Sequence, residues 1–212
     1  MLSKEIIRTL EKLPFFDITI AKNLIPHDSY LRMIVSRYSK LGKIVRLMKG
    51  FYTSKSYIDM IQKQGRYSSF VEFIANVLYP ASYISGEYVL HKHNILTESV
   101  VTITNMSLCK TAHFSNSLGN FIYHTIKKDL FTGYTMHNRE DFTIFEATKA
   151  KALFDYLYLR KKYLTHKSSI RELRLNIDSL TTKDMNELKK YVRLENSKRL
   201  KMIYSMLFRE DT

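Results

Sequence analysis

The apolar positions of the first forty residues predict three short helices. Apolar residues recur every three or four positions in segments 3–13 and 29–41, which is the spacing of an amphipathic helix. A brief helix is expected between them, at 19–24. Gly42 follows the third segment directly, so we expect it to end that helix in a left-handed conformation.

The stretch LGKIVRLMKGFYTSK, residues 41–55, predicts a two-stranded hairpin. Two short apolar runs flank Lys49 and Gly50, and Gly50 permits the turn between them. Phe51 and Tyr52 are expected to hold the returning strand against the core. Three short helices followed by such a hairpin are typical of a winged helix-turn-helix, whose third helix lies in the major groove of DNA.

The third helix also has a polar face with no carboxylate on it, when side chains are placed at about 100 degrees per residue. Arg32 and Arg37 are the candidates for base contacts, because a guanidinium can form two hydrogen bonds with guanine. Lys40, Lys43 and Lys49 are the candidates for phosphate contacts. The alternative is a winged helix that binds protein, with a polar face that is only solvated. The predicted DNA-binding residues are Ser29, Arg32, Met33, Ser36, Arg37, Lys40, Lys43, Arg46 and Lys49.

Beyond residue 60 the pattern changes. Residues 56–80 are interpreted as a connector followed by an amphipathic helix, whose buried side carries Phe70, Phe73, Ile74, Val77 and Leu78. Alternating apolar and polar runs in 98–147 predict a mostly antiparallel sheet, and later amphipathic segments predict helices. The expected fold class is therefore α+β, with a winged helix-turn-helix domain at 1–60 and a mixed α/β domain at 61–212 that ends in basic helices.

Positive charge is concentrated at the two ends of the chain. The 34 Lys and Arg exceed the 20 Asp and Glu, which gives a net charge of +14. The net charge is +8 over 1–66, −1 over 67–150 and +7 over 151–212. This distribution favours a polyanionic partner, although a basic surface that only keeps the protein soluble is the alternative. Candidates for additional phosphate contacts in the last segment, whose alternative is a solvated helical surface, are Arg171, Arg174, Lys189, Lys190, Lys198, Arg199 and Lys201.

Export and membrane insertion are not expected. The first residues lack the apolar core of a signal peptide, and nowhere do about 18 apolar residues follow one another. Cys109 is the single cysteine, so it has no partner for an internal disulfide. These features predict a bacterial cytoplasmic protein that does not associate with membranes.

The sequence contains few residue patterns typical of catalytic sites. A metal-dependent nuclease often carries an Asp and a Glu-x-Lys on a strand, and Asp141 with Glu146 and Lys149 comes near that pattern. However, two residues separate Glu146 from Lys149, which would place them on opposite faces of a strand. The histidines lie singly, apart from His91 and His93, and no phosphate-binding loop is present. We therefore expect no enzyme activity, no catalytic residue, no metal and no cofactor.

Three segments, in order, carry a resemblance to a known family. They are GKIVRLMKGFY at 42–52, YISGEYVLHKHNIL at 83–96 and FEATKAKALFDYL at 145–157. Together they resemble the AbiEi-type antitoxins and transcriptional regulators of type IV toxin-antitoxin systems, over residues 5–163. The Lys-Gly-Phe-Tyr at 49–52 departs from the commoner Arg-Gly-x-Tyr of that family.

The resemblance implies a winged-helix repressor of its own operon. Such proteins are encoded beside a nucleotidyltransferase-like toxin and have a C-terminal domain that serves antitoxicity. We accordingly expect an antitoxin that binds double-stranded DNA at an inverted-repeat operator, as two copies of the chain. The alternative is a protein-protein adaptor that neutralises a nucleotidyltransferase-like toxin without physiological DNA binding.

Overall fold

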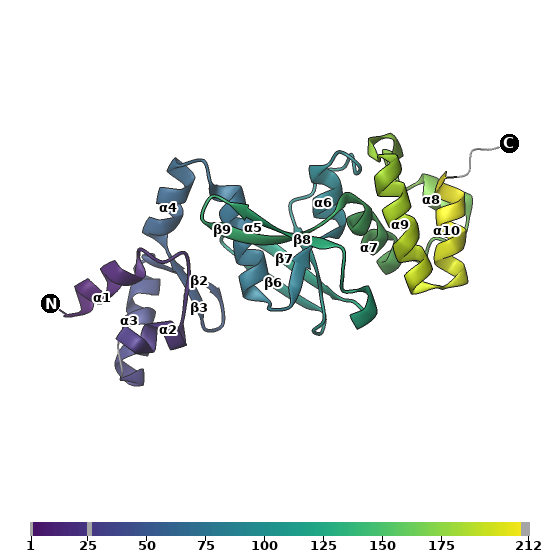
Figure 1. The fold of residues 1–212 in the computed structure, drawn as a ribbon. Coiled ribbons are helices and arrows are strands. Elements are labelled where there is room, and N and C mark those ends of the chain that lie inside the picture. The colour runs from purple at the N-terminus through teal and green to yellow at the C-terminus, as the bar shows by residue number, and fades with distance from the viewer. Residues whose placement is uncertain (1, 25–26, 209–212) are drawn as a thin grey trace. The chain divides into compact units, whose positions relative to one another are not determined.

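The computed structural model describes residues 2–24 and 27–208, which form two compact units. The first unit comprises the described residues up to Leu78 together with Phe114–Asn120 (Figure 1). The second comprises Tyr79–His113 and the described residues from Phe121 onward. Within these described ranges no helix has both the length and the apolar character needed to cross a membrane.

The first unit consists of helices around a small antiparallel sheet. Its strand order is β1-β3-β2 in the described residues. In chain order its elements are α1 (Leu2–Leu10), β1 (Phe16–Asp17), α2 (Ile18–Leu24), α3 (Asp28–Lys40), β2 (Ile44–Met48), β3 (Phe51–Ser54), α4 (Lys55–Lys63) and α5 (Tyr67–Leu78).

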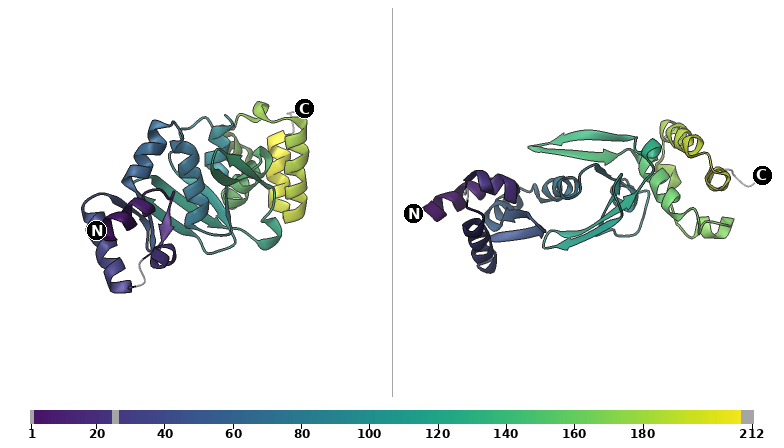
Figure 2. Two further views of the ribbon diagram at one scale, coloured as in Figure 1. Left: turned by 60° about the vertical axis from the view of Figure 1, so that its left-hand side comes forward. Right: turned by 90° about the horizontal axis from the view of Figure 1, so that it is seen from below.

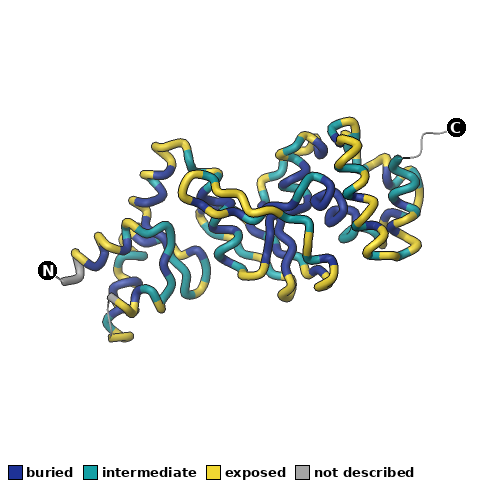
Figure 3. Tube along the Cα trace, viewed as in Figure 1, coloured by how far each residue is buried: buried dark blue, intermediate teal, exposed yellow. Residues whose placement is uncertain are grey.

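The core of this unit is built from the apolar faces that the sequence predicted. Leu10 of α1, Phe16 of β1, Leu31 and Ile34 of α3 and Ile44 of β2 are buried in one cluster. Helices α1, α2 and α3 place apolar residues on this cluster, and α3 leaves its polar face exposed (Figure 3).

The first unit extends to Leu78, beyond the boundary near residue 60 that the sequence suggested. The segment interpreted as a connector is helix α4, which begins directly after β3. The Ser54 hydroxyl caps it by accepting a hydrogen bond from the Tyr57 backbone N–H at 3.0 Å. Tyr57 then packs its ring against Phe70 of α5, with 5.5 Å between ring centroids. These contacts join both helices to the first unit.

The second unit contains most of a six-stranded sheet with helices, in the order β6-β7-β5-β4-β9-β8. The pairs β4–β5 and β8–β9 are antiparallel, whereas β4–β9 and β5–β7 are parallel. The elements of the sheet and of the rest of the chain are β4 (Ser82–Ile84), α6 (Gly86–Lys92), β5 (Ile103–Ser107), β6 (Ala112–Asn116), β7 (Gly119–Thr125), η1 (Lys128–Leu130), β8 (Tyr134–Arg139), β9 (Phe142–Ala147), α7 (Lys149–Arg160), α8 (Lys167–Arg171), η2 (Ile177–Ser179), α9 (Thr182–Glu195) and α10 (Lys198–Phe208). The end of β6 and the start of β7 belong to the first unit.

The α+β class with a mostly antiparallel arrangement of strands and C-terminal helices is confirmed. Helix α7 packs against α6 and α9, and α10 packs against α9. Figure 2 shows α9 and α10, at the yellow end of the colour scale, side by side. The parallel pairings were not predicted, because strand partners far apart in the sequence are chosen by packing and not by local pattern.

Candidate nucleic-acid interface

Helix α3 presents two opposite faces, one buried and one exposed. Leu31, Ile34 and Val35 are buried in the core of the first unit. All six residues predicted to contact DNA from this helix are exposed, and they are Ser29, Arg32, Met33, Ser36, Arg37 and Lys40. Met33, a large apolar side chain on the same face, is 55% exposed.

The end of α3 fixes where the following hairpin starts. Gly42 has φ of +68°, as predicted for the residue that ends the helix. The Gly42 N–H donates to the Ser39 carbonyl at 3.0 Å, and the Lys43 N–H donates to the Tyr38 carbonyl at 2.9 Å. This pair of bonds is a Schellman motif, so the helix and the hairpin are joined by ordered backbone and not by a loose linker.

The β2–β3 hairpin carries the three other predicted cations, and all are exposed: Lys43, Arg46 and Lys49. Gly50 forms the turn at φ of +86°. The returning strand is held by its aromatic residues, because Phe51 stacks on Phe15 and Tyr52 stacks on Phe16. The expectation that these two aromatic residues fasten β3 to the unit is confirmed.

Strand β2, at the edge of the small sheet, accepts a hydrogen bond that the sequence did not predict. β2 contains a bulge between Arg46 and Met48, which leaves Leu47 outside the regular pairing with β3. The Asn116 side-chain amide donates to the Leu47 carbonyl at 3.0 Å, and both residues belong to the first unit. The sequence gives no sign of this contact, because the two residues are separated by 69 positions along the chain. It restrains the hairpin at its bulged edge.

The seven C-terminal cations are all exposed, but they lie on several elements. Arg171 ends α8, and Arg174 lies in the loop after it with φ of +47°. Lys189 and Lys190 are neighbours on α9. The other three, Lys198, Arg199 and Lys201, are in the first turn of α10, where Lys201 donates to the Asn196 side chain at 2.6 Å.

A buried ionic cluster lies in the second unit. Asp155 and Lys151, one turn apart on α7, are both fully buried, with 2.6 Å between the carboxylate and the ammonium. Asp155 also accepts hydrogen bonds from the Ser85 hydroxyl at 2.7 Å and the Tyr83 hydroxyl at 3.1 Å. Burial raises the pKa of Asp155 and of Tyr83 and lowers that of Lys151. Because these charges are sealed from solvent, we assign them a structural role.

Glu146 and Lys149 of the nuclease alternative lie on different elements. Glu146 lies on β9 and is surrounded by cations, with 2.6 Å to Lys92 and 3.3 Å to Arg139. Thr148 caps α7, so Lys149 belongs to a helix and not to the strand of Glu146. Among the residues that the structure describes, no three His, Cys, Asp or Glu side chains gather where they could hold a metal ion.

Comparison with known proteins identifies no family for this chain. No protein-family model matches it, and no curated protein sequence matches it. The resemblance to AbiEi-type antitoxins therefore stays a prediction that depends on three segments of the sequence.

Proposed function

We propose that the chain is a sequence-specific DNA-binding repressor. In this proposal α1 to β3 are a winged helix-turn-helix, with α3 as the recognition helix and the β2–β3 hairpin as the wing. The protein would act as the antitoxin of a type IV toxin-antitoxin system of the AbiEi type and repress its own operon at an inverted repeat. The observation that supports this most is the exposure of all nine predicted contact residues on two elements joined by ordered backbone.

Recognition would divide between bases and phosphates. Arg32 and Arg37 project from the exposed face of α3 and can each form two hydrogen bonds with the edge of a guanine. Met33 can make an apolar contact with the methyl group of a thymine. Lys43, just before β2, and Lys49, at the turn of the hairpin, are suited to phosphates, which fix position and add no sequence preference.

Binding to the DNA upstream of the protein's own gene tests the proposal. Fluorescence anisotropy with that duplex and with a scrambled duplex, over a series of salt concentrations, gives both the affinity and the sequence preference. Neutralised phosphates make the logarithm of affinity fall linearly with the logarithm of salt concentration. Lys49→Ala should reduce that slope by about one and weaken both duplexes alike. Arg32→Ala and Arg37→Ala should each cost about 1–3 kcal/mol on the preferred duplex alone.

Lys63→Ala serves as the matched control, because Lys63 is an exposed cation of the same unit that lies on α4. It should leave the preferred duplex bound as before. The proposal fails if the upstream duplex is not preferred, or if neither arginine matters.

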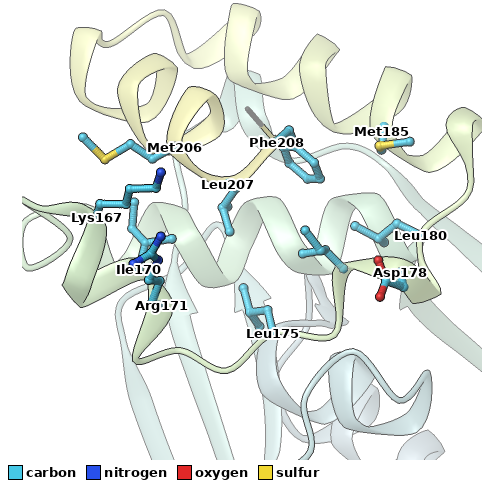
Figure 4. A pocket seen from close by; sticks show the side chains of 11 residues that line it. Lys167, Ile170, Arg171, Leu175, Asp178, Leu180, Met185, Met206, Leu207 and Phe208 are labelled. Carbon is cyan, nitrogen blue, oxygen red and sulfur yellow. The ribbon is translucent and has the colours of Figure 1, made fainter. Parts of the chain in front are cut away.

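A groove in the second unit supports the second candidate, the adaptor that neutralises a nucleotidyltransferase-like toxin. The groove has a volume of about 730 Å³ and is lined by α8, η2, α9 and α10. Figure 4 shows apolar side chains such as Leu175 and Leu207 along it, with Lys167 and Arg171 at one end and Asp178 at the other. An apolar partner segment with an acidic end would suit this lining. An affinity for duplex DNA that does not change with salt concentration, with no preferred duplex, would favour the adaptor.

A further inference from the structure

Strand β8 forms one edge of the six-stranded sheet, and most of its side chains are exposed. In the described sheet its strand neighbour is β9 alone. Thr135, Met136, His137 and Asn138 are consecutive and all exposed, so neither face of the strand is covered at these positions (Figure 3). Met136 is 60% exposed. This large apolar side chain lies near the middle of the open edge.

Sheet edges usually carry features that prevent pairing with another strand. Proline, lysine and β-bulges are the common ones, since the edge backbone otherwise offers unpaired N–H and C=O groups. Residues 134–138, YTMHN, contain no proline and no Lys, Arg, Asp or Glu. The register between β8 and β9 runs from Tyr134 to Arg139 without a bulge. Residues 134–138 of β8 therefore form a regular edge without these protections, and Arg139 at the end of the strand is paired with Glu146.

We propose that β8 pairs antiparallel with β8 of a second copy of this chain. A two-fold axis perpendicular to the sheet makes such an interface self-complementary, and it requires residues of the same face to oppose one another. Centring the axis on Met136 achieves this. Met136 then faces its own copy, Tyr134 faces Asn138 and Thr135 faces His137.

The side chains suit this register. Met136 lies across from Phe145 of β9, and Tyr134 packs edge-on against the same Phe145 ring at 6.2 Å. The Met136 side chains of the two copies, each beside a Phe145 ring, would meet at the axis and be removed from water. On the other face, Thr135 and His137 already lie 2.8 Å apart and offer hydroxyl and imidazole groups to their counterparts. No formally charged side chain faces a like charge in this register.

A second copy is also what an inverted-repeat operator requires, and in this use the inference rests on the proposed function. Two copies joined at β8 would carry two recognition helices. The pairing itself needs no DNA, so it can be tested separately.

Sedimentation equilibrium of the full chain without DNA tests the pairing. Met136→Lys would place two ammonium groups together at the axis, so this variant should be monomeric where the unchanged protein is dimeric. Thr143→Lys is the matched control, because Thr143 is exposed on the same face of the sheet but lies one strand inward, on β9. That variant should remain dimeric. A monomeric unchanged protein, or a dimer that survives Met136→Lys, would overturn the proposal.

Cross-linking gives an independent measurement of the register. With Cys109→Ser removing the native thiol, Met136→Cys should form a disulfide-linked dimer when oxidised by diamide. Thr143→Cys should not, since two residues 143 would be three strand spacings apart, about 14 Å across the sheet, and offset along the strands as well. Efficient cross-linking through position 143 and not 136 would refute the register centred on Met136.

DNA binding distinguishes failure of this inference from failure of the proposed function. Met136→Lys should keep its affinity for a duplex with a single half-site and lose the additional affinity for the full inverted repeat. Arg32→Ala should remain dimeric and lose preference among duplexes. A dimer without DNA preference would refute the repressor alone, whereas a DNA-binding monomer unaffected by Met136→Lys would refute the β8 pairing alone.

Discussion

The buried pair of Asp155 and Lys151 offers the sharpest test of how the second unit is held together. The Asp155 carboxylate accepts three hydrogen bonds, from Lys151 at 2.6 Å, Ser85 at 2.7 Å and Tyr83 at 3.1 Å. Asp155→Ala removes all three and leaves the Lys151 ammonium buried without its counter-charge. The variant is therefore expected to destabilise the unit severely.

The size of the loss follows from these contacts. A hydrogen bond to a charged group contributes about 1.5–3 kcal/mol, so three independent bonds would exceed about 4 kcal/mol. They share one carboxylate and are not additive. Breaking a buried ion pair by removing one partner costs about 3–5 kcal/mol. We expect Asp155→Ala to lower the free energy of unfolding by about 4 kcal/mol, a large part of the total for a typical domain.

Urea unfolding followed by circular dichroism measures the change. Asp129→Ala is the control, because Asp129 is an exposed carboxylate of the same unit. The double variant Lys151→Met with Asp155→Leu should recover part of the loss, because it removes the uncompensated buried ammonium, whereas the Ser85 and Tyr83 hydroxyls still lack the acceptor that Asp155 provides. A cost below about 1 kcal/mol for Asp155→Ala, or a double variant no more stable than the single one, would refute the reasoning.

Further expectations concern backbone space, the hairpin and pH. Gly133→Ala should destabilise the second unit, because φ is +78° and a Cβ would lie 2.2 Å from the Tyr191 hydroxyl; its urea midpoint measures this. Asn116→Ala should accelerate amide hydrogen exchange in the β2–β3 hairpin, because it removes a hydrogen bond from the edge of β2 and costs about 1 kcal/mol. Burial lowers the pKa of His93 and of His124, so the unfolded chain binds protons more readily. The urea midpoint should therefore decrease as the pH is lowered below about 6.5. Replacing both histidines by glutamine should make the midpoint less dependent on pH in that range.

Local pattern predicted the elements of the candidate interface well. The helical spacing of apolar residues gave α3 its buried face, and the two runs around Gly50 gave the hairpin. Both are short-range features, since a helix face and a tight turn depend on neighbours within a few residues. The exposure of the nine predicted side chains follows from the same geometry.

The features that were missed depend on contacts across the chain or on weak local signals. Helix α4 was interpreted as a connector, although Ser54 followed by Tyr57, Ile58 and Ile61 has the cap and the spacing of a helix start. The bond from Asn116 to the β2 edge has no local signal at all. The parallel pairing of β4 with β9 likewise joins segments that only packing brings together.

The buried cluster changes what the family resemblance can support. Tyr83 and Ser85 come from the second segment of the resemblance, and Lys151 and Asp155 come from the third. Their identities are explained by one hydrogen-bonded ion pair that joins α7 to the β4–α6 region. Such residues would be required in any protein with this packing, whatever its activity. The two segments therefore support the architecture of the second unit, and the case for DNA binding depends on α3 and the β2–β3 hairpin.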